Sequence, residues 1–403
     1  MRNLHILMVN HHRRSKIHFA YRSLAMARYL GRRGHTITLL TTADQRKDRI
    51  VVDMGDGVKI VEIPDLLWGQ LRSGWDLWSA FNRLSYLWRS NDKFDLIHLF
   101  ESRPAVIHPV QVFQTKRRLP LIIDWADWIG RGGIMEVRRP KWYRLLFGRV
   151  ETFYEEHFRK HANGLTVICS ALRERAISMG VPSDAILKIP IGADLDVYPA
   201  VLDKLACRSA VGIAEDAKIL AFAGVDADFD LPLILNAVTQ VVHQYPKIRL
   251  MLLGKSNPAV LKLANEYGIE GKIIAPGYVP FDLFPMYLGC ADFFLLPFPN
   301  TIYNIGRWPS KVCDYMASGR PIVSNPTGDI KTLFEQYEVG LLADENADDI
   351  AAKILYLFDH PQVAEFLGQN ARQTAETHYA WPNLIQGLES FYSHVLERVR
   401  KQN

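Results

Sequence analysis

Several features that would assign this 403-residue chain to a membrane-spanning, metal-binding or disulfide-bonded class are missing. It contains no run of about 18 apolar residues, which argues against a transmembrane helix. The opening MRNLHILMVNHHRR has a short apolar run without a small-residue cleavage site, so we expect a first β-strand there rather than a signal peptide. The four cysteines are scattered with no CxxC pair, which predicts reduced, mostly buried thiols, no metal site and a cytoplasmic location.

The glycine fingerprint G-x-G-x-x-G is also absent after every expected strand. Its absence disfavours a Rossmann-type dehydrogenase, which binds a dinucleotide at that turn. Apolar residues make up 48% of the chain and charged residues 23%, which is enough for two ordinary hydrophobic cores. At this length, two domains are the expected organisation.

Positive charge is concentrated in the first half of the chain. Residues 1–200 contain 31 lysines and arginines against 20 acidic residues, whereas the remainder contains 17 against 23. Seven of the nine tryptophans also lie in the first half. This composition indicates an anionic partner, such as a membrane surface, a nucleic acid or a phosphorylated acceptor, although a solvated basic surface explains it equally well.

Short apolar runs alternate with segments of helical spacing throughout the chain, which is typical of parallel strands covered by helices. The alternation begins with LHILMVN (4–10) and restarts at AKILAFAG (217–224). We therefore predict an α/β protein with two doubly wound, Rossmann-like domains, 1–195 and 196–380, that face a cleft. A C-terminal helix in 381–403 is expected to pack back toward the first domain. Ligands of such sheets bind beyond the carboxyl ends of the strands.

The most informative stretch is RWPSKVCDYMASGRPIVSNPTGDI, from Arg307 to Ile330. It predicts a short helix that follows a glycine-containing loop and ends at Gly319. Such a helix N-terminus is a prepared anion site, to which Arg307 and Lys311 add positive charge. Asp314, one turn further on, can accept two hydrogen bonds from a vicinal diol such as a ribose. The combination predicts a nucleoside diphosphate site, but an ordinary capped helix with a surface Lys–Asp pair is the simpler alternative.

This block resembles the donor-binding segment of the GT-B fold glycosyltransferases, especially family 4 (group 1). A subgroup of that family reads P-x-K-x-x-E-Y-x-A-x-G-x-P, which the chain matches from Pro309 to Pro321, with Asp314 in place of the glutamate. LAMARYLGRRGHTITLLTT resembles the family's first helix and second strand, and residues 165–198 resemble its segment ending in N-G-V-D. The resemblance covers nearly the whole chain. It implies transfer of a hexose-type sugar from a nucleoside diphosphate sugar to a glycan or lipid-linked acceptor, with no cofactor besides that donor.

The resemblance also implies roles for individual donor-site residues. Asp314 would bind the nucleotide ribose, and Lys311 and Arg307 are the candidates for the diphosphate. The backbone around Asn304–Gly306 would approach the donor sugar, and Gly224 would end the first strand of the donor domain.

The sequence departs from the family pattern at two places. Gly306 stands where the family usually has a glutamate, eight residues before the second acid. The loop GVDADFD carries Asp226, Asp228 and Asp230 where many members have an arginine and a lysine. Such acids repel a diphosphate unless a cation compensates, and an Asp-x-Asp pair can bind a metal, although a solvated acidic loop is the commoner case. These departures keep two alternatives open: a non-catalytic or altered member that binds a nucleotide or glycan, and a sugar-nucleotide epimerase.

In the first domain, DWADWIG resembles the family's HD or RDLWP position, which would place Asp127 near the reacting centre. A carboxylate there could act as a base toward an acceptor hydroxyl in an inverting enzyme, or orient the acceptor in a retaining one. Alternatively, Asp124 or Asp127 caps the next helix.

The remaining candidates follow the expected strands LHILMVN (4–10) and DLIHLF (95–100). His11, His12, Arg13 and Lys16 form a basic loop that would meet donor phosphates or an acidic acceptor, or simply be solvated. Glu101 is expected either to reach the acceptor or to lie on the surface.

Two segments combine tryptophan with basic residues, 65–90 and RRPKWYRLLFGR (138–149). Such helices suit an anionic bilayer interface. The alternative is a helix whose aromatic residues pack on the sheet. The regional excess of positive charge favours peripheral attachment to the inner face of a membrane, and we expect no nucleic-acid partner.

Overall fold

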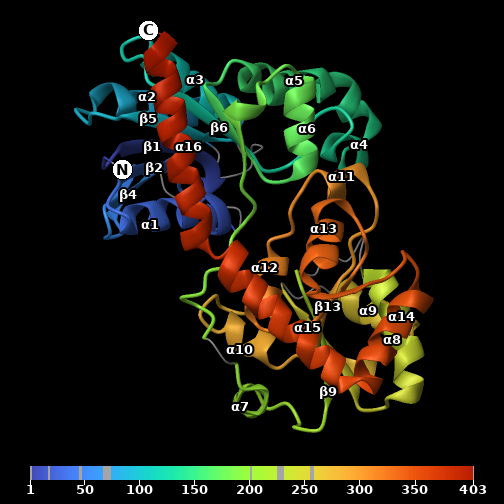
Figure 1. The fold of residues 1–403 in the computed structure, drawn as a ribbon. Coiled ribbons are helices and arrows are strands. Elements are labelled where there is room, and N and C mark those ends of the chain that lie inside the picture. Colours follow the sequence, from blue (N-terminus) through green and yellow to red (C-terminus); the bar gives the residue numbers. More distant parts are fainter. Residues whose placement is uncertain are drawn as a thin grey trace. The chain divides into compact units, whose positions relative to one another are not determined.

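The structure is a computed structural model that describes residues 2–16, 19–44, 48–66, 74–199, 202–224, 231–254 and 258–402. The chain divides into two compact units (Figure 1). The N-terminal unit contains Met1–Ile191, Gly306–Trp308 and Trp381–Asn403, and the C-terminal unit contains Gly192–Ile305 and Pro309–Ala380. The polypeptide therefore leaves the N-terminal unit and returns to it twice.

In the described part of the N-terminal unit, an eight-stranded sheet has the order β3-β4-β2-β1-β5-β6-β7-β8. Its strands are β1 (His5–Arg13), β2 (Thr36–Thr42), β3 (Ile50–Asp53), β4 (Val58–Ile63), β5 (Leu96–Phe100), β6 (Leu121–Trp125), β7 (Gly164–Val167) and β8 (Ile186–Lys188). Neighbouring strands are parallel except β3, which is antiparallel to β4. β5 and β6 are buried along their whole length, as expected for parallel strands covered on both faces.

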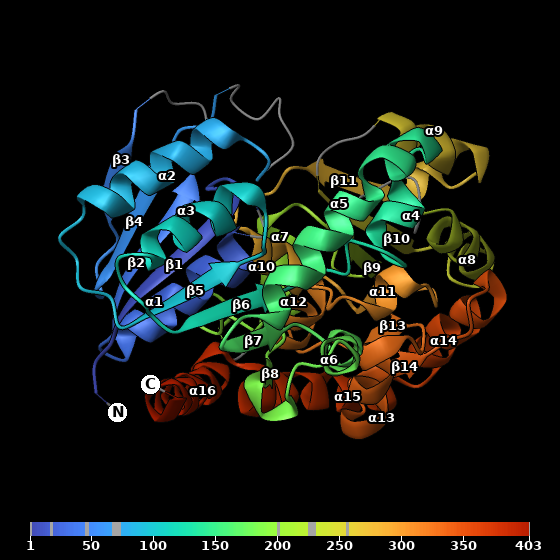
Figure 2. The ribbon, with the colours of Figure 1, turned by 90° about the horizontal axis from the view of Figure 1, so that it is seen from above.

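Helices cover both faces of this sheet. They are α1 (Ala25–Arg32), α2 (Leu77–Arg89), α3 (Pro104–Gln114), α4 (Ile134–Arg138), α5 (Lys141–Lys160), α6 (Ser170–Ser178) and α16 (Trp381–Gln402), with a π-helical turn Phe19–Leu24 before α1 and a 3₁₀ turn Ser183–Ala185 before β8. In Figure 2, α2, α3 and α5 lie on one face, and α1 and α16 lie on the other.

The last helix, α16, is fixed to the N-terminal unit by buried polar and aromatic contacts. The ring of Trp381 stacks on Tyr29 with centroids 6.4 Å apart. The Glu389 carboxylate lies 2.9 Å from Nε2 of His35, and the hydroxyl of Tyr392 lies 2.7 Å from Nδ1 of His98 on β5. The segment 381–403 is thus part of the N-terminal unit.

The C-terminal unit, in the residues described, contains a six-stranded parallel sheet of order β11-β10-β9-β12-β13-β14. The strands are β9 (Lys218–Ala223), β10 (Ile248–Leu253), β11 (Ile273–Gly277), β12 (Phe293–Leu296), β13 (Ile322–Ser324) and β14 (Gly340–Leu342). The helices are α7 (Lys204–Ala210), α8 (Leu231–Gln244), α9 (Pro258–Glu266), α10 (Phe284–Gly289), α11 (Ile302–Ile305), α12 (Lys311–Ala317), α13 (Gly328–Tyr337), α14 (Ala347–Asp359) and α15 (Pro361–Thr374), with a 3₁₀ turn Glu270–Lys272 and a π-helical turn Ala375–Tyr379. Buried apolar side chains of α8 and α14 form much of the core beneath this sheet.

The strand orders place a topological switch point in each sheet. β1 lies between β2 and β5, and β9 lies between β10 and β12, so the chain turns in opposite directions on the two sides of each strand. Ligands of doubly wound sheets bind at the carboxyl ends of strands at such points. The predicted α/β class with two doubly wound, Rossmann-like sheets is confirmed.

None of the four cysteines, all of which lie in described segments and are buried, forms a disulfide. Within the segments given above, we found no helix both long and apolar enough to cross a bilayer.

Candidate functional site

Lys311, the first residue of α12, lies at the carboxyl end of the central strand β9. Its ammonium nitrogen is 4.1 Å from the ring centroid of Phe222, the penultimate residue of that strand. Gly224 follows β9 with φ of 84°, a backbone conformation that favours glycine. A Cβ added at Gly224 would lie 3.4 Å from Nζ of Lys311, so the two residues are close neighbours. The structure therefore places the ammonium group of Lys311 beside the backbone turn at Gly224, at the topological switch point of the sheet.

Asp314 lies one turn into α12 and is buried, with 6% of its surface exposed. Its Oδ1 accepts a hydrogen bond of 2.9 Å from the hydroxyl of Tyr198. The sequence analysis missed Tyr198, although it ends the segment that resembles the family pattern. The pair Lys311–Asp314 is thus not a solvated surface pair, because the aspartate is enclosed by the C-terminal unit.

Tyr315 fixes α12 against the sheet. Its ring stacks on Phe294 of β12 with centroids 4.0 Å apart and planes 3° from parallel. Its hydroxyl accepts a 2.8 Å hydrogen bond from the backbone N–H of Ala223 at the end of β9. Burial raises the pKa of the Tyr315 phenol, so the group stays protonated at neutral pH. The tyrosine of the P-x-K-x-x-E-Y pattern therefore sets the position of the helix that carries Lys311 and Asp314.

A second helix N-terminus, that of α13, belongs to the same unit. Gly328 begins α13 with φ of 53°, and a Cβ there would lie 3.3 Å from Cα of Ile305 in α11. Thr327 precedes it, and its buried hydroxyl has no hydrogen-bond partner among the residues that the structure describes. Asn304 of α11 is buried and donates to the backbone oxygen of Pro299 at 2.8 Å. The turn NPTGD was the signal that could have identified Thr327, since a small polar residue before glycine marks a helix start.

Two of the predicted donor residues belong to the other unit. Gly306 and Arg307 are grouped with the N-terminal unit, and Arg307 is half-buried there. Lys311, Gly224 and Asp314 thus lie together within one unit, whereas the donor roles of Gly306 and Arg307 stay predictions. The predicted acidic loop, Asp226 to Asp230, lies outside the described residues. Elsewhere in the chain, as far as it is described, no three His, Cys, Asp or Glu side chains cluster as metal ligands do.

In the N-terminal unit, His11 and His12 end strand β1. Their ring centroids are 4.1 Å apart, and His11 is buried. A Cβ on Gly74, whose φ is 83°, would lie 3.1 Å from the His11 ring and 2.6 Å from Cβ of Arg103, so glycine is required for this close packing. Beyond them, Arg13 forms an ion pair with Asp65, and Lys16 is exposed. The residues of the predicted basic loop therefore differ in their surroundings. The two histidines lie near the carboxyl end of β1, and Arg13 forms an ion pair within the fold.

Glu101 follows β5 in a left-handed conformation with φ of 70°, which is uncommon for a residue with a side chain. Its carboxylate is buried, lies 3.0 Å from Nη2 of Arg159 and accepts a long hydrogen bond of 3.4 Å from the N–H of Ala126. Burial raises the pKa of Glu101, with a further contribution from the nearby Asp127, while the arginines oppose the shift. Strained backbone of this kind, here at the end of strand β5, is a frequent property of functional sites. The structure therefore brings Glu101 and Asp127 within electrostatic reach of each other.

Asp124 has a structural partner rather than a capping role. Its carboxylate accepts hydrogen bonds from Arg22 at 2.6 and 3.0 Å and from the hydroxyl of Thr166 at 2.5 Å. Burial by itself would raise the pKa of Asp124, but Arg22 and these hydrogen bonds outweigh it, and the pKa is lowered. The next helix, α4, has Gly133 at its N-cap position. The alternative in which Asp124 or Asp127 caps that helix is therefore wrong.

Glu155 of α5 holds the loop that carries Asp127. Its carboxylate accepts hydrogen bonds from the backbone N–H groups of Ile129 at 2.7 Å and Gly130 at 2.5 Å, and from Nε1 of Trp125 at 3.0 Å. The sequence analysis missed this role. The spacing of Glu151, Glu155 and Arg159, which puts three charged side chains on one helical face, was the available signal.

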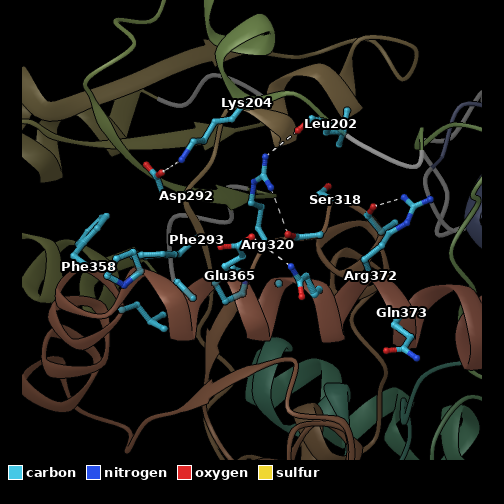
Figure 3. Close-up of a pocket in the computed structure, with 18 of the residues that line it drawn as sticks. Leu202, Lys204, Asp292, Phe293, Ser318, Arg320, Phe358, Glu365, Arg372 and Gln373 are labelled. Atoms are coloured by element: carbon cyan, nitrogen blue, oxygen red, sulfur yellow. Dashed lines mark hydrogen bonds and ion pairs between the residues drawn. The ribbon is translucent and has the colours of Figure 1, made fainter.

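A hollow in the C-terminal unit lies at the other end of its sheet, beside the amino ends of β12 and β13. Its volume is about 700 Å³. In Figure 3, Lys204 pairs with Asp292 at 2.7 Å, and Arg320 donates to the backbone oxygen of Leu202 at 3.0 Å. Arg372 donates to the backbone oxygen of Ala317 at the end of α12. The hollow lies at the amino ends of the strands and Lys311 lies at the carboxyl end of β9, so the two sites are distinct.

Comparison with known proteins identifies the family. The family model described as Glycosyltransferase Family 4 matches residues 21–197, and the one described as Glycosyl transferases group 1 matches residues 217–360. The two matches fall on the two Rossmann-like sheets. The chain belongs to the group 1, family 4 glycosyltransferases. This confirms the family that the donor-binding block indicated.

Similar proteins agree with this assignment. The D-inositol 3-phosphate glycosyltransferase of Thermobispora bispora is 24% identical over 234 residues, which cover 55% of this chain and 53% of that protein. The chain thus spans about half the length of the curated relatives it matches.

Solved structures show that the fold of this glycosyltransferase is GT-B. The sucrose-phosphate synthase of Thermosynechococcus elongatus is similar with a TM-score of 0.74 and 15% identity, over 98% of this chain and 100% of that chain. Anabaena HepE, in complex with UDP and glucose, is similar with a TM-score of 0.71 and 16% identity, over 97% of this chain and 100% of that chain.

Proposed function

We propose that this glycosyltransferase moves a hexose-type sugar from a nucleoside diphosphate sugar to a glycan or lipid-linked acceptor, in polysaccharide or glycolipid synthesis in the cytoplasm. The observation that carries the proposal is the pairing, on one short helix, of Lys311 at the carboxyl end of β9 with the enclosed carboxylate of Asp314. A cation and a buried carboxylate one turn apart suit a diphosphate and a ribose. The similarity in fold to a protein solved with UDP and glucose supports the same class of donor.

The proposed roles follow from the chemistry of these side chains. Asp314 accepts hydrogen bonds from the two ribose hydroxyls, and Lys311 balances the diphosphate charge together with the N–H groups that begin α12 and α13. In the transfer, the bond between the anomeric carbon and the diphosphate oxygen breaks, and the acceptor oxygen forms the new bond and loses its proton. Asp127 is the candidate to take that proton in an inverting reaction, or to orient the acceptor in a retaining one.

The donor site is tested by nucleotide binding and by donor-dependent release of nucleoside diphosphate from a panel of sugar nucleotides. We expect Asp314→Asn and Lys311→Ala each to weaken nucleotide binding by about 10- to 100-fold, the usual range for losing a hydrogen bond to a charged group. Lys331→Ala, which removes an exposed lysine of α13 in the same unit, is the matched control and should behave as wild type. If no sugar nucleotide shifts the melting temperature and Asp314→Asn changes nothing, the proposed donor site is wrong.

A second candidate function is a non-catalytic member that binds a nucleotide or glycan. Gly306 favours it, because the position has no side chain to contact a donor sugar. Binding of nucleoside diphosphates without release from any sugar nucleotide, across a panel of acceptors, would support this candidate over transfer.

We also propose that the protein attaches peripherally to the inner face of a membrane. The support is the excess of 31 basic over 20 acidic residues in positions 1–200, together with their tryptophan content.

A further inference from the structure

Helix α5 turns three of its charged side chains inward. Glu151, Glu155 and Arg159 are spaced by four residues and so share one face, and all three are buried. Glu151 pairs with Arg103, and Arg159 donates to Oγ of Ser102 at 2.8 Å, in addition to the contacts of Glu155 and Arg159 described above. Each of the three buried charges has an oppositely charged partner, so the orientation of the helix is fixed by its polar face.

The outward face of α5 is apolar. Trp142, Leu145, Leu146 and Phe153 are spaced as one helical stripe, and their exposed fractions are 61%, 84%, 63% and 49%. An ordinary surface helix has the reverse arrangement, with apolar residues toward the core. The alternative in which the aromatic residues of this segment pack on the sheet therefore fails for Trp142. An apolar stripe of this length on a water-exposed helix marks an interaction surface.

The charge around the stripe has one sign. From residue 137 to residue 150 the chain contains five basic residues and no acidic one; the five are Arg138, Arg139, Lys141, Arg144 and Arg149. Helix α2 offers a contrast within the same layer (Figure 2), because it exposes Leu77 and Phe81, but its Arg83 is fully buried. Exposed apolar area occurs on both helices, whereas the combination with a basic segment occurs on α5.

We propose that the outward face of α5 docks on an anionic lipid bilayer. Trp142, Leu145 and Leu146 enter the boundary between headgroups and acyl chains, and Lys141 and Arg149 contact the headgroup phosphates. If a second copy of the chain bound to this face about a two-fold axis, the basic segment 137–150 of one copy would face the same basic segment of the other. Repulsion between these like charges opposes such a dimer. The inference deepens the peripheral attachment proposed above and rests on the proposed function, since a lipid-linked acceptor would lie in that bilayer.

The test is co-sedimentation of the full chain with phosphatidylcholine vesicles, with and without phosphatidylglycerol, at low and high salt. We expect binding to the anionic vesicles that falls as salt is raised. Leu145→Ser combined with Leu146→Ser should weaken it at least about 10-fold, because two apolar side chains no longer enter the bilayer. Replacing Lys141, Arg144 and Arg149 together by glutamine should weaken it on the order of 100-fold.

The matched control is Leu77→Ser combined with Phe81→Ser on α2, which removes comparable exposed apolar area at positions whose nearest basic residue on the helix, Arg83, is buried, and it should leave binding unchanged. Nucleotide binding in the absence of lipid should be unchanged in the α5 variants, whereas Asp314→Asn should lose nucleotide and keep vesicle binding, so the two proposals fail separately. Equal binding to neutral vesicles, no binding to anionic ones, or an equal loss in the α2 variant would overturn the assignment. The assignment would also be overturned if light scattering showed an oligomer for the wild type and a monomer for the α5 serine variant. The occupant of the α5 face would then be a second copy of the chain.

Discussion

The carboxylate of Asp314 does not act alone, because the hydroxyl of Tyr198 donates to it at 2.9 Å. The two residues are 116 positions apart in the chain, and Tyr198 itself is buried. The hydrogen bond restricts the rotation of the carboxylate. Tyr198 is therefore a positioning residue for the proposed ribose contact.

Replacing Tyr198 by phenylalanine tests this role at the scale of a single hydroxyl. We expect the KM for the donor to rise on the order of 10-fold while kcat changes little, because the interaction serves donor binding. Tyr245→Phe is the control, since it also removes a hydroxyl bonded to an aspartate of the same unit, but in a hydrogen bond that is exposed to solvent. Equal donor KM values for Tyr198→Phe and wild type, measured by nucleoside diphosphate release, would assign the pair a structural role only.

Sequence reasoning at this scale predicted a shared location for residues that are linked by local spacing. Lys311 and Asp314 are three positions apart on one helix, so their shared location followed from helical geometry. Tyr198 and Glu155 act across the fold, and no local pattern links them to their partners. The positive φ of Glu101 was equally inaccessible, because residue type does not disclose such strain unless the residue is glycine.

At the scale of elements, α5 determines the shape of the loop after β6. Its Glu155 accepts three hydrogen bonds from that loop and the adjoining tryptophan. The loop carries Asp127, so the long helix that follows this loop and the short α4 holds a candidate catalytic residue in place.

Glu155→Ala should therefore affect both stability and activity. It leaves buried N–H donors without an acceptor, and we expect the free energy of unfolding to fall by about 2–4 kcal/mol, with a lower kcat. Glu174→Ala, at an exposed glutamate of the same unit, is the control. Urea denaturation and steady-state kinetics measure the two effects, and a Glu155→Ala variant as stable and as active as wild type would contradict the assignment.

The positions of most strands could be predicted, because buried parallel strands are short apolar runs between helices. The orientation of α5 could not, although its periodicity was visible. A periodic pattern shows which side chains share a face, but it does not show whether that face meets water or the sheet. Arg103, Ser102 and the loop after β6 decide this for α5, and they come from other elements.

At the scale of the whole molecule, β5 and α16 meet at His98. Its Nδ1 lies 2.7 Å from the Tyr392 hydroxyl, and its Nε2 lies 3.1 Å from Oγ1 of Thr166. Burial lowers the pKa of His98 from 6.5 to about 4, with Arg22 acting in the same direction and Asp124 opposing it. Between these two pKa values the imidazole is therefore neutral in the folded protein and protonated in the unfolded chain.

The sign of the pH dependence follows from this difference. Between about pH 6.5 and pH 4 the unfolded chain binds a proton that the folded chain does not, so the free energy of unfolding falls as pH falls. This group should contribute a loss of roughly 2 kcal/mol between pH 7 and pH 5. His98→Gln should reduce that loss, and His161→Gln, at an exposed position of the same unit, should not. Urea denaturation followed by tryptophan fluorescence at both pH values measures the free energy of unfolding. An equal loss of this free energy between pH 7 and pH 5 in wild type and His98→Gln would contradict the prediction.

The return of α16 to the N-terminal unit also bears on the order in which the protein can fold during synthesis. The ribosome releases β1 to β8 first, but Trp381, Glu389 and Tyr392, which cover Tyr29, His35 and His98, emerge almost last. All of the C-terminal unit leaves the ribosome before them. The N-terminal unit, although made first, is therefore the one completed second, and the nascent chain must keep one face of its sheet uncovered until the final helix arrives.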